Sequence, residues 1–148
     1  MSLVEPVTRI ILEWIRGPSP LDIRLDGHIR IVNPQDSGAW DEWTIGAKIA
    51  VNRENKVDGV IRWQVGRASK KSEFYGQEGY AADEFVDGQF DREALLMRIE
   101  GKRVVPVGME TGSYVIELLG DMKNFTIRDV PSGCVGDGSA TVEQRIVA

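Results

Sequence analysis

The sequence predicts an all-β protein: a mainly antiparallel meander barrel or strongly curled sheet of about eight or nine strands, with one N-terminal amphipathic helix. Apolar and polar residues alternate along much of the chain after residue 20, and this period-two pattern gives a strand one buried and one solvated face. Sixteen glycines and six prolines are spread between these segments, as expected for many turns. Because 148 residues suffice for one domain with a sizeable core, we assign residues 1–148 to a single barrel-like domain.

The helix is predicted at residues 4–16. Its apolar residues recur at spacings of three, four, seven and eight, which places them on one helix face: Val7, Ile10, Ile11, Trp14 and Ile15. Pro6 suits the first turn, and Gly17-Pro18 ends the helix. We expect the apolar face to pack on the barrel or to cap it, with docking of a partner as the alternative.

The strongest strand signal is a hairpin between Trp43 and Val65 that turns at Asn52–Lys56. Its alternating apolar residues are Trp43, Ile45, Ala47, Ile49 and Val51 on the first strand, and Val57, Ile61, Trp63 and Val65 on the second. Upstream, Leu21–Ile31 alternates without a break and predicts one long strand suited to a barrel wall. A hairpin turn at Asp26-Gly27 is the alternative there.

The middle of the chain is less regular. We expect a weak strand at Glu73–Tyr75 and an ambiguous segment at Tyr80–Phe90, with a turn at Asp87–Gln89. The strand phase returns at Ala94–Glu100 and closes at Lys102. Residues 91–100 also favour a helix by composition, so strand and helix both stay open there.

The C-terminal part predicts a hairpin of Tyr114–Leu119 and Phe125–Val130, a glycine-rich loop at Pro131–Ser139 and a last strand at Ala140–Val147. A meander barrel with an N-terminal helix resembles the lipocalin-type architecture in outline. The lipocalin Gly-x-Trp motif lies near the first strand, whereas Gly38-Ala39-Trp40 follows a long strand here, so the resemblance is limited to the outline.

Composition disfavours several partners. The net charge of −5 argues against nucleic-acid binding, which needs clustered lysine and arginine. No run approaches the about 20 apolar residues of a membrane span. Glu5, Arg9 and Glu13 interrupt any secretory pattern at the N-terminus. We therefore expect a cytoplasmic, bacterial or phage protein without a membrane or nucleic-acid partner.

Motifs for catalysis or metal binding are scarce. His28 and Cys134 are the only histidine and cysteine, so a nucleophile–base pair would need both, and the usual zinc site lacks ligands. We predict no catalytic residues, no metal site and no cofactor. The acidic cluster of Asp83, Glu84 and Asp87 lacks the EF-hand pattern and is interpreted as a solvated edge that offers a surface for a partner. An enzyme that uses carboxylates is the third class considered.

Two apolar features favour a binding function. Trp43 and Trp63 share the inward phase of the hairpin, and an uncharged apolar run, residues 104–109, occupies a place where a polar loop is expected. We predict a non-catalytic protein that holds a small apolar or amphipathic ligand in the barrel, lined by Trp43 and Trp63 and guarded by Val105, Val107 and Met109. The alternative is a protein-interaction module, an adaptor or inhibitor of the immunity type, that uses the same loop and the acidic surface of Asp83, Glu84 and Asp87. A barrel filled by its own side chains would favour the second.

Overall fold

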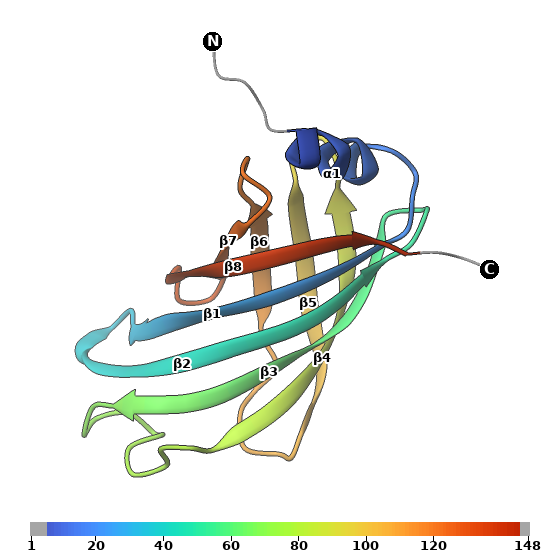
Figure 1. Ribbon diagram of the computed structural model, residues 1–148. Coiled ribbons are helices and arrows are strands. Elements are labelled where there is room, and N and C mark those ends of the chain that lie inside the picture. Colours follow the sequence, from blue (N-terminus) through green and yellow to red (C-terminus); the bar gives the residue numbers. More distant parts are fainter. Residues whose placement is uncertain (1–5, 146–148) are drawn as a thin grey trace.

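The computed structural model describes residues 6–145 as a closed antiparallel meander barrel of eight strands with one N-terminal helix, α1 (Pro6–Arg16) (Figure 1). Each strand pairs with its neighbours in the chain, and β8 closes the barrel on β1. The predicted fold class is confirmed. The strands are β1 (Leu21–Asn33), β2 (Asp36–Val51), β3 (Lys56–Ala68), β4 (Ala81–Asp91), β5 (Leu96–Val105), β6 (Ser113–Leu118), β7 (Asn124–Asp129) and β8 (Val135–Gln144).

The predicted hairpin forms as β2 and β3, with Ile45 opposite Trp63 and Ala47 opposite Ile61. Its alternating apolar side chains are buried as expected. The turn is fixed by the Asn52 side chain, whose Oδ1 accepts hydrogen bonds from the backbone N–H groups of Glu54 and Lys56, each at 2.9 Å. Local turn chemistry and period-two burial therefore select the same register.

Residues 21–31 lie in one strand, β1, rather than in a hairpin. Gly27 permits a close crossing with β8, because a Cβ atom there would lie 2.2 Å from the carbonyl oxygen of Asp137. Gly138 is equally constrained, since its Cβ would lie 2.0 Å from the Asp26 oxygen. The predicted glycine-rich loop is thus wrong from Val135 onward: these glycines belong to β8, where two backbones approach too closely for a side chain.

Three other predictions need correction or completion. The turn expected at Asp87–Gln89 is wrong, because β4 continues through it against β5. Residues 96–100 are strand rather than helix, and β5 runs beyond the expected end to Val105. The weak strand at Glu73–Tyr75 is wrong: these residues form successive turns, and the Ser72 hydroxyl accepts a hydrogen bond from the Phe74 N–H at 3.0 Å. Local hydrogen bonds replace strand pairing there.

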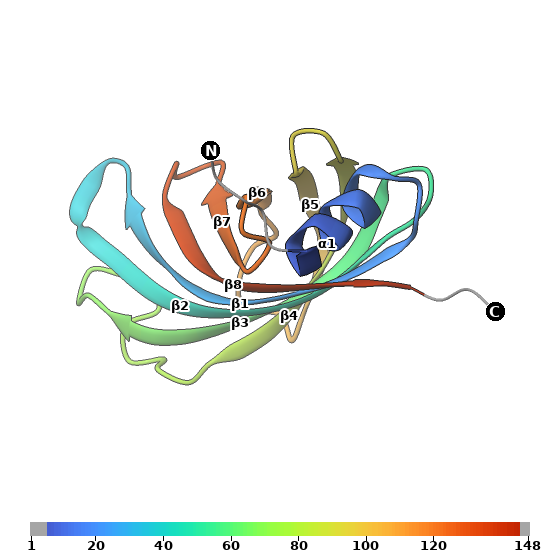
Figure 2. The ribbon, with the colours of Figure 1, turned by 45° about the horizontal axis from the view of Figure 1, so that its top comes forward.

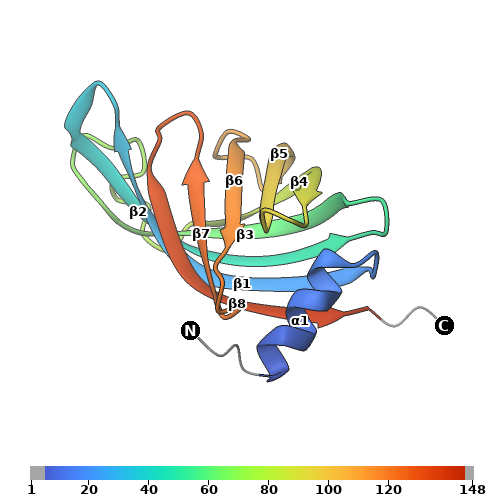
Figure 3. The ribbon, with the colours of Figure 1, turned by 90° about the horizontal axis from the view of Figure 1, so that it is seen from above.

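Helix α1 lies across one end of the barrel (Figures 2 and 3). Ile15 is fully buried against the core, whereas Ile10 remains exposed. Residues 4 and 5 of the predicted helix, and residues 146 and 147 of the predicted last strand, lie outside the described residues. In the described part of the chain, no helix has the length and apolar character needed to cross a bilayer.

Arg92, in the turn between β4 and β5, fixes the helix end to the barrel. Its guanidinium donates hydrogen bonds to the backbone oxygens of Trp14, Ile15, Gly17, Ser19 and Asn52, and to Oδ1 of Asn55. The side chain is 7% exposed. These carbonyls include the last ones of α1, which lack partners within the helix. Arg92 therefore acts as a C-terminal cap that also joins two neighbouring turns.

Apolar side chains fill the barrel interior next to α1. Every strand contributes to this core. The fully buried members include Leu21, Ile23, Ile61, Met97, Ile116 and Phe125. The interior near α1 is therefore an apolar core.

Candidate functional site

The barrel end opposite α1, which we call the mouth, is formed by the turn at residues 34–35 and the loops 69–80, 106–112 and 130–134. A hollow of about 300 Å³ opens there. Strands β1, β2, β3, β6 and β7 contribute to its wall, together with all three loops. The mouth hollow thus collects residues from distant parts of the chain.

Four aromatic side chains line the mouth hollow: Trp43, Trp63, Phe74 and Tyr114. The Trp43 ring lies 6.1 Å from Trp63 and 4.7 Å from Phe74, both edge to face. The Trp63 and Tyr114 ring centres are 5.3 Å apart. Such contacts favour one defined arrangement of rings beyond the gain from burial alone. The aromatic wall is therefore mutually supported.

Glu84 lies behind this wall, on the inner face of β4, and is 0% exposed. Its Oε1 accepts hydrogen bonds from the Tyr114 hydroxyl at 2.5 Å and from the Trp63 indole N–H at 3.0 Å. Its Oε2 accepts one from the Gly112 backbone N–H at 2.7 Å. All three donor residues line the mouth hollow. Glu84 therefore positions the hollow's wall without facing the solvent.

Burial raises the pKa of the Glu84 carboxyl above its ordinary value, and the hydrogen bonds from Tyr114, Gly112 and Trp63 oppose this rise. Burial, followed by the charge of Glu84, raises the pKa of the Tyr114 hydroxyl. Tyr114 therefore keeps its proton and remains a donor to the carboxylate. The group is a structural hydrogen-bond network with one titratable acid at its centre.

Four carboxylates complete the wall: Asp41, Glu73, Glu110 and Asp129. Asp41 accepts a hydrogen bond from the Trp43 indole N–H at 2.5 Å and another from the Ser72 hydroxyl at 2.8 Å. Asp129 Oδ2 accepts the Ser132 hydroxyl at 2.5 Å. None of the thirteen residues that line the hollow is basic. Like charges around a concave, partly apolar surface focus a negative potential into it.

The structure places some of the predicted ligand residues together and separates others. Trp43, Trp63 and Met109 line the mouth hollow. Val105 and Val107 are instead 50% and 94% exposed on the outside of the adjoining strand and loop. Of the apolar run, only its last residue thus reaches the hollow.

The predicted acidic surface divides in the same way. Asp83 and Asp87 face outward, with Asp83 Oδ1 at 3.3 Å from Arg62 and Asp87 Oδ1 at 3.4 Å from Lys102. Glu84, expected beside them, is buried in the barrel. The next residue, Phe85, lies on the outer face of β4 with Asp83 and Asp87. The guanidinium of Arg103 lies 4.3 Å from the centre of the Phe85 ring.

The sequence-based prediction did not include Phe74 or Tyr114, and it placed Glu84 on the solvated surface, whereas Glu84 is buried. Tyr114 had a usable signal, because it shares the inward phase of β6 with Ile116 and Leu118. Glu84 had a weaker one, since it lies two residues from both Ala82 and Val86. Phe74 gave none, because its place depends on how the loop 69–80 folds back over Trp43.

His28 and Cys134 do not interact. His28 is exposed on β1, with Nε2 at 3.8 Å from Asp137 Oδ1. The Cys134 sulfur accepts a hydrogen bond from the Val32 N–H at 3.3 Å. Within residues 6–145, no group of three or more His, Cys, Asp or Glu side chains is placed to hold a metal ion.

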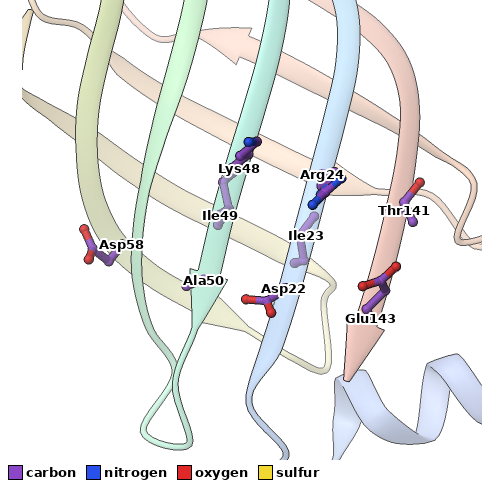
Figure 4. A pocket seen from close by; sticks show the side chains of 9 residues that line it. All are labelled: Asp22, Ile23, Arg24, Lys48, Ile49, Ala50, Asp58, Thr141 and Glu143. Carbon is purple, nitrogen blue, oxygen red and sulfur yellow. The ribbon is translucent and has the colours of Figure 1, made fainter. Parts of the chain in front are cut away.

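A second hollow, of about 290 Å³, lies on the outer wall of β1, β2, β3 and β8 (Figure 4). Charged side chains of both signs surround it: Asp22, Arg24, Lys48, Asp58 and Glu143. These residues are exposed on the solvated face of the sheet, and no aromatic ring lines the site. Small-molecule sites are mostly apolar with a few polar groups, so the mouth hollow is the stronger candidate. Comparisons with protein-family models, curated proteins and solved structures find no match for this chain.

Proposed function

We propose that this protein is a non-catalytic binding protein that holds a small amphipathic ligand in the mouth hollow. The observation that carries the proposal is an open, aromatic-lined space of about 300 Å³ at one end of a barrel with an apolar core. Four aromatic rings and Met109 offer apolar contact, and four carboxylates supply charged groups in the same lining. This pattern is typical of sites that orient a small molecule by one polar end.

The core limits where a ligand can lie. The sequence suggested a ligand inside the barrel, but the buried core next to α1 leaves the mouth as the available space. A volume of about 300 Å³ is at the lower limit for small-molecule sites. The proposed ligand is therefore small and remains partly in contact with solvent.

The hydrogen bonds to Glu84 support a preformed site. They hold two aromatic rings and the Gly112 backbone in place before any ligand arrives. Binding to a rigid wall loses less conformational entropy than binding that must order the wall first. A small apolar contact area can then still give measurable affinity.

Titration with 2-phenylethanol, followed by tryptophan fluorescence, tests the proposal. We expect saturable binding that weakens by about tenfold in Phe74→Ala, because one aromatic wall of the hollow is lost. Phe85→Ala is the matched control, since Phe85 lies on the outer face of β4. Equal weakening in both variants, or the absence of saturable binding both for this probe and for its charged analogue 2-phenylethylammonium, contradicts the proposal. A native mass spectrum of freshly purified protein would also reveal a ligand that is carried through purification.

A protein-interaction module remains the second candidate, and one observation favours it. Among the described residues, five of the six exposed large hydrophobic side chains lie at the mouth: Tyr75, Val105, Val107, Val130 and Val135. Exposed apolar groups gathered at one end of a molecule are typical of contact surfaces. Loss of a partner in Val107→Ser with unchanged melting would favour this function over ligand binding.

A further inference from the structure

Building on the proposed function, we infer that the ligand of the mouth hollow is a small organic cation, such as a protonated amine or a quaternary ammonium group. Two independent features of the hollow carry this inference. Its lining includes four aromatic side chains, and its charged side chains are four carboxylates with no basic side chain among them. Each feature alone is compatible with other ligands, but together they match a positive charge on an apolar body.

The aromatic rings form adjoining walls rather than one flat surface. The planes of Trp43 and Trp63 meet at 88°, and those of Trp43 and Phe74 at 79°. The three rings therefore do not lie in one plane. A cation against a tryptophan or tyrosine face gains about 0.5–2 kcal/mol from the negative face of the ring, and alkylammonium groups are bound in aromatic cages in this way.

The carboxylates surround the mouth instead of meeting at one point. Asp41 lies on β2, Glu73 on the loop 69–80, Glu110 on the loop 106–112, and Asp129 at the end of β7. A metal ion such as calcium needs several oxygen ligands about 2.3–2.6 Å from a common centre. The described residues contain no such group of three. A distributed negative field suits a larger cation whose charge is spread over an organic group.

The lining of the mouth hollow also differs in charge from the outer wall, and the Lys71–Asp36 ion pair lies outside this lining. On that wall, acidic side chains pair with basic ones, as in Arg62–Asp83, Lys102–Asp87 and Arg145–Asp22. None of the ion pairs found in the described part of the chain includes the four carboxylates of the hollow. No side chain in residues 6–145 therefore pairs with these charges at ion-pair distance. A cationic ligand would supply the missing complement.

The test compares 2-phenylethylammonium with 2-phenylethanol on the full chain, because the two probes have nearly the same size and differ in charge. We expect the ammonium probe to bind about tenfold more tightly at low salt. Raising sodium chloride from about 0.1 M to about 1 M shortens the Debye length from about 10 Å to about 3 Å, and should remove much of this preference.

Charge-neutral variants locate the effect. The double variant Glu73→Gln with Glu110→Gln should weaken ammonium binding about threefold to tenfold and should affect the uncharged 2-phenylethanol by a clearly smaller factor. Glu117→Gln with Glu143→Gln makes the same change in net charge on the outer wall, away from the mouth, and should have no effect. Melting curves confirm that both double variants are folded.

The outcomes separate this inference from the proposed function. If both probes bind equally well, or if the two double variants behave alike, the cation inference is overturned while ligand binding at the mouth stands. If neither probe binds, both are overturned. A tighter ammonium complex that depends on Glu73 and Glu110 supports both.

Discussion

The two ends of the barrel each bury one charged side chain, Arg92 beneath α1 and Glu84 beneath the mouth, and the two ends use them differently. Arg92 is 7% exposed and Glu84 is 0% exposed. Neither belongs to an ion pair among the described residues. Both are satisfied by hydrogen bonds to neutral groups, which a buried charge needs when no counter-ion is present.

The partners of the two charges explain the difference. Arg92 binds carbonyl oxygens of the helix end and two turns, so its hydrogen bonds close one end of the barrel. Burial lowers the pKa of Arg92, but arginine starts so far above neutrality that the guanidinium stays charged. Glu84 binds residues that line the mouth hollow. The first charge therefore stabilises a closed end, whereas the second shapes an open one.

The largest effect on stability is expected from Arg92→Met. This change leaves several backbone oxygens near the end of α1 without a donor, and should lower the free energy of unfolding by about 3 kcal/mol or more. Binding of 2-phenylethanol to the folded variant should be unchanged, because the hollow lies at the other end. Urea unfolding measures the first quantity, with Arg98→Met on the exposed face of β5 as control. An equal decrease in the free energy of unfolding in the two variants would contradict the capping role of Arg92.

Glu84→Gln should have a smaller effect on stability but should also weaken binding. The amide oxygen can accept from Tyr114 and Trp63, but the amide nitrogen then meets the Gly112 N–H, and two donors oppose each other. We expect a loss of about 1–3 kcal/mol in the free energy of unfolding. Asp83→Asn, one residue away on the outer face, should change it by less than about 0.5 kcal/mol. Similar losses in both variants would mean that burial of Glu84 is not what matters.

The raised pKa of Glu84 predicts that the free energy of unfolding depends on pH. We expect this effect to be smaller than that of either substitution above. The folded protein takes up a proton at Glu84 at a higher pH than the unfolded chain does. The stabilising contribution of this protonation is therefore fully present below the unfolded pKa and is lost as the pH rises through the folded pKa.

Urea titrations at several pH values can measure this contribution. Between about pH 8 and about pH 5, wild type should gain stability relative to Glu84→Gln, which lacks the titrating group. The contributions of the other carboxylates to the pH dependence cancel in this comparison, because both proteins contain them. A constant difference, or a loss by wild type on acidification, would contradict the raised pKa.

The smallest effect is expected at Val107, which is 94% exposed. Val107→Ser should change the free energy of unfolding by less than about 0.5 kcal/mol and should not alter probe binding, because the side chain lies outside the mouth hollow. Met109→Ser, two residues away, should weaken probe binding because Met109 lines the hollow. If the two variants weaken binding equally, the apolar run as a whole would act on the ligand.

Much of the barrel could be predicted from sequence because its signals are local. The β2–β3 hairpin follows from alternation and from the Asn52 turn, and this pattern also brings Trp43 and Trp63 onto one inner wall. The prediction of a loop at Gly136 and Gly138 was wrong because glycine usually marks a turn. Here the two glycines lie in β8 and permit its close crossing with β1.

The buried charges could not be predicted in the same way. In β4 the adjacent apolar residues Phe85 and Val86 leave the phase ambiguous, and a glutamate is ordinarily placed outside. Only the pairing with β3, where Glu84 lies opposite Ile61, settles that it points inward. Arg92 follows a strand end and looks like a solvated turn residue, and its partners from α1 are more than seventy residues away. Both placements depend on long-range pairing that no local pattern contains.

The most direct test of ligand binding at the mouth is the indole N–H spectrum of the four tryptophans during titration with 2-phenylethylammonium. Trp43 and Trp63 line the hollow, Trp14 lies on α1 at the other end, and Trp40 lies under the Arg30 guanidinium. We predict that the resonances of Trp43 and Trp63 move saturably while that of Trp14 stays fixed and that of Trp40 changes little. Uniform shifts of all four, or a response confined to Trp14, would contradict a ligand site at the open end of the barrel.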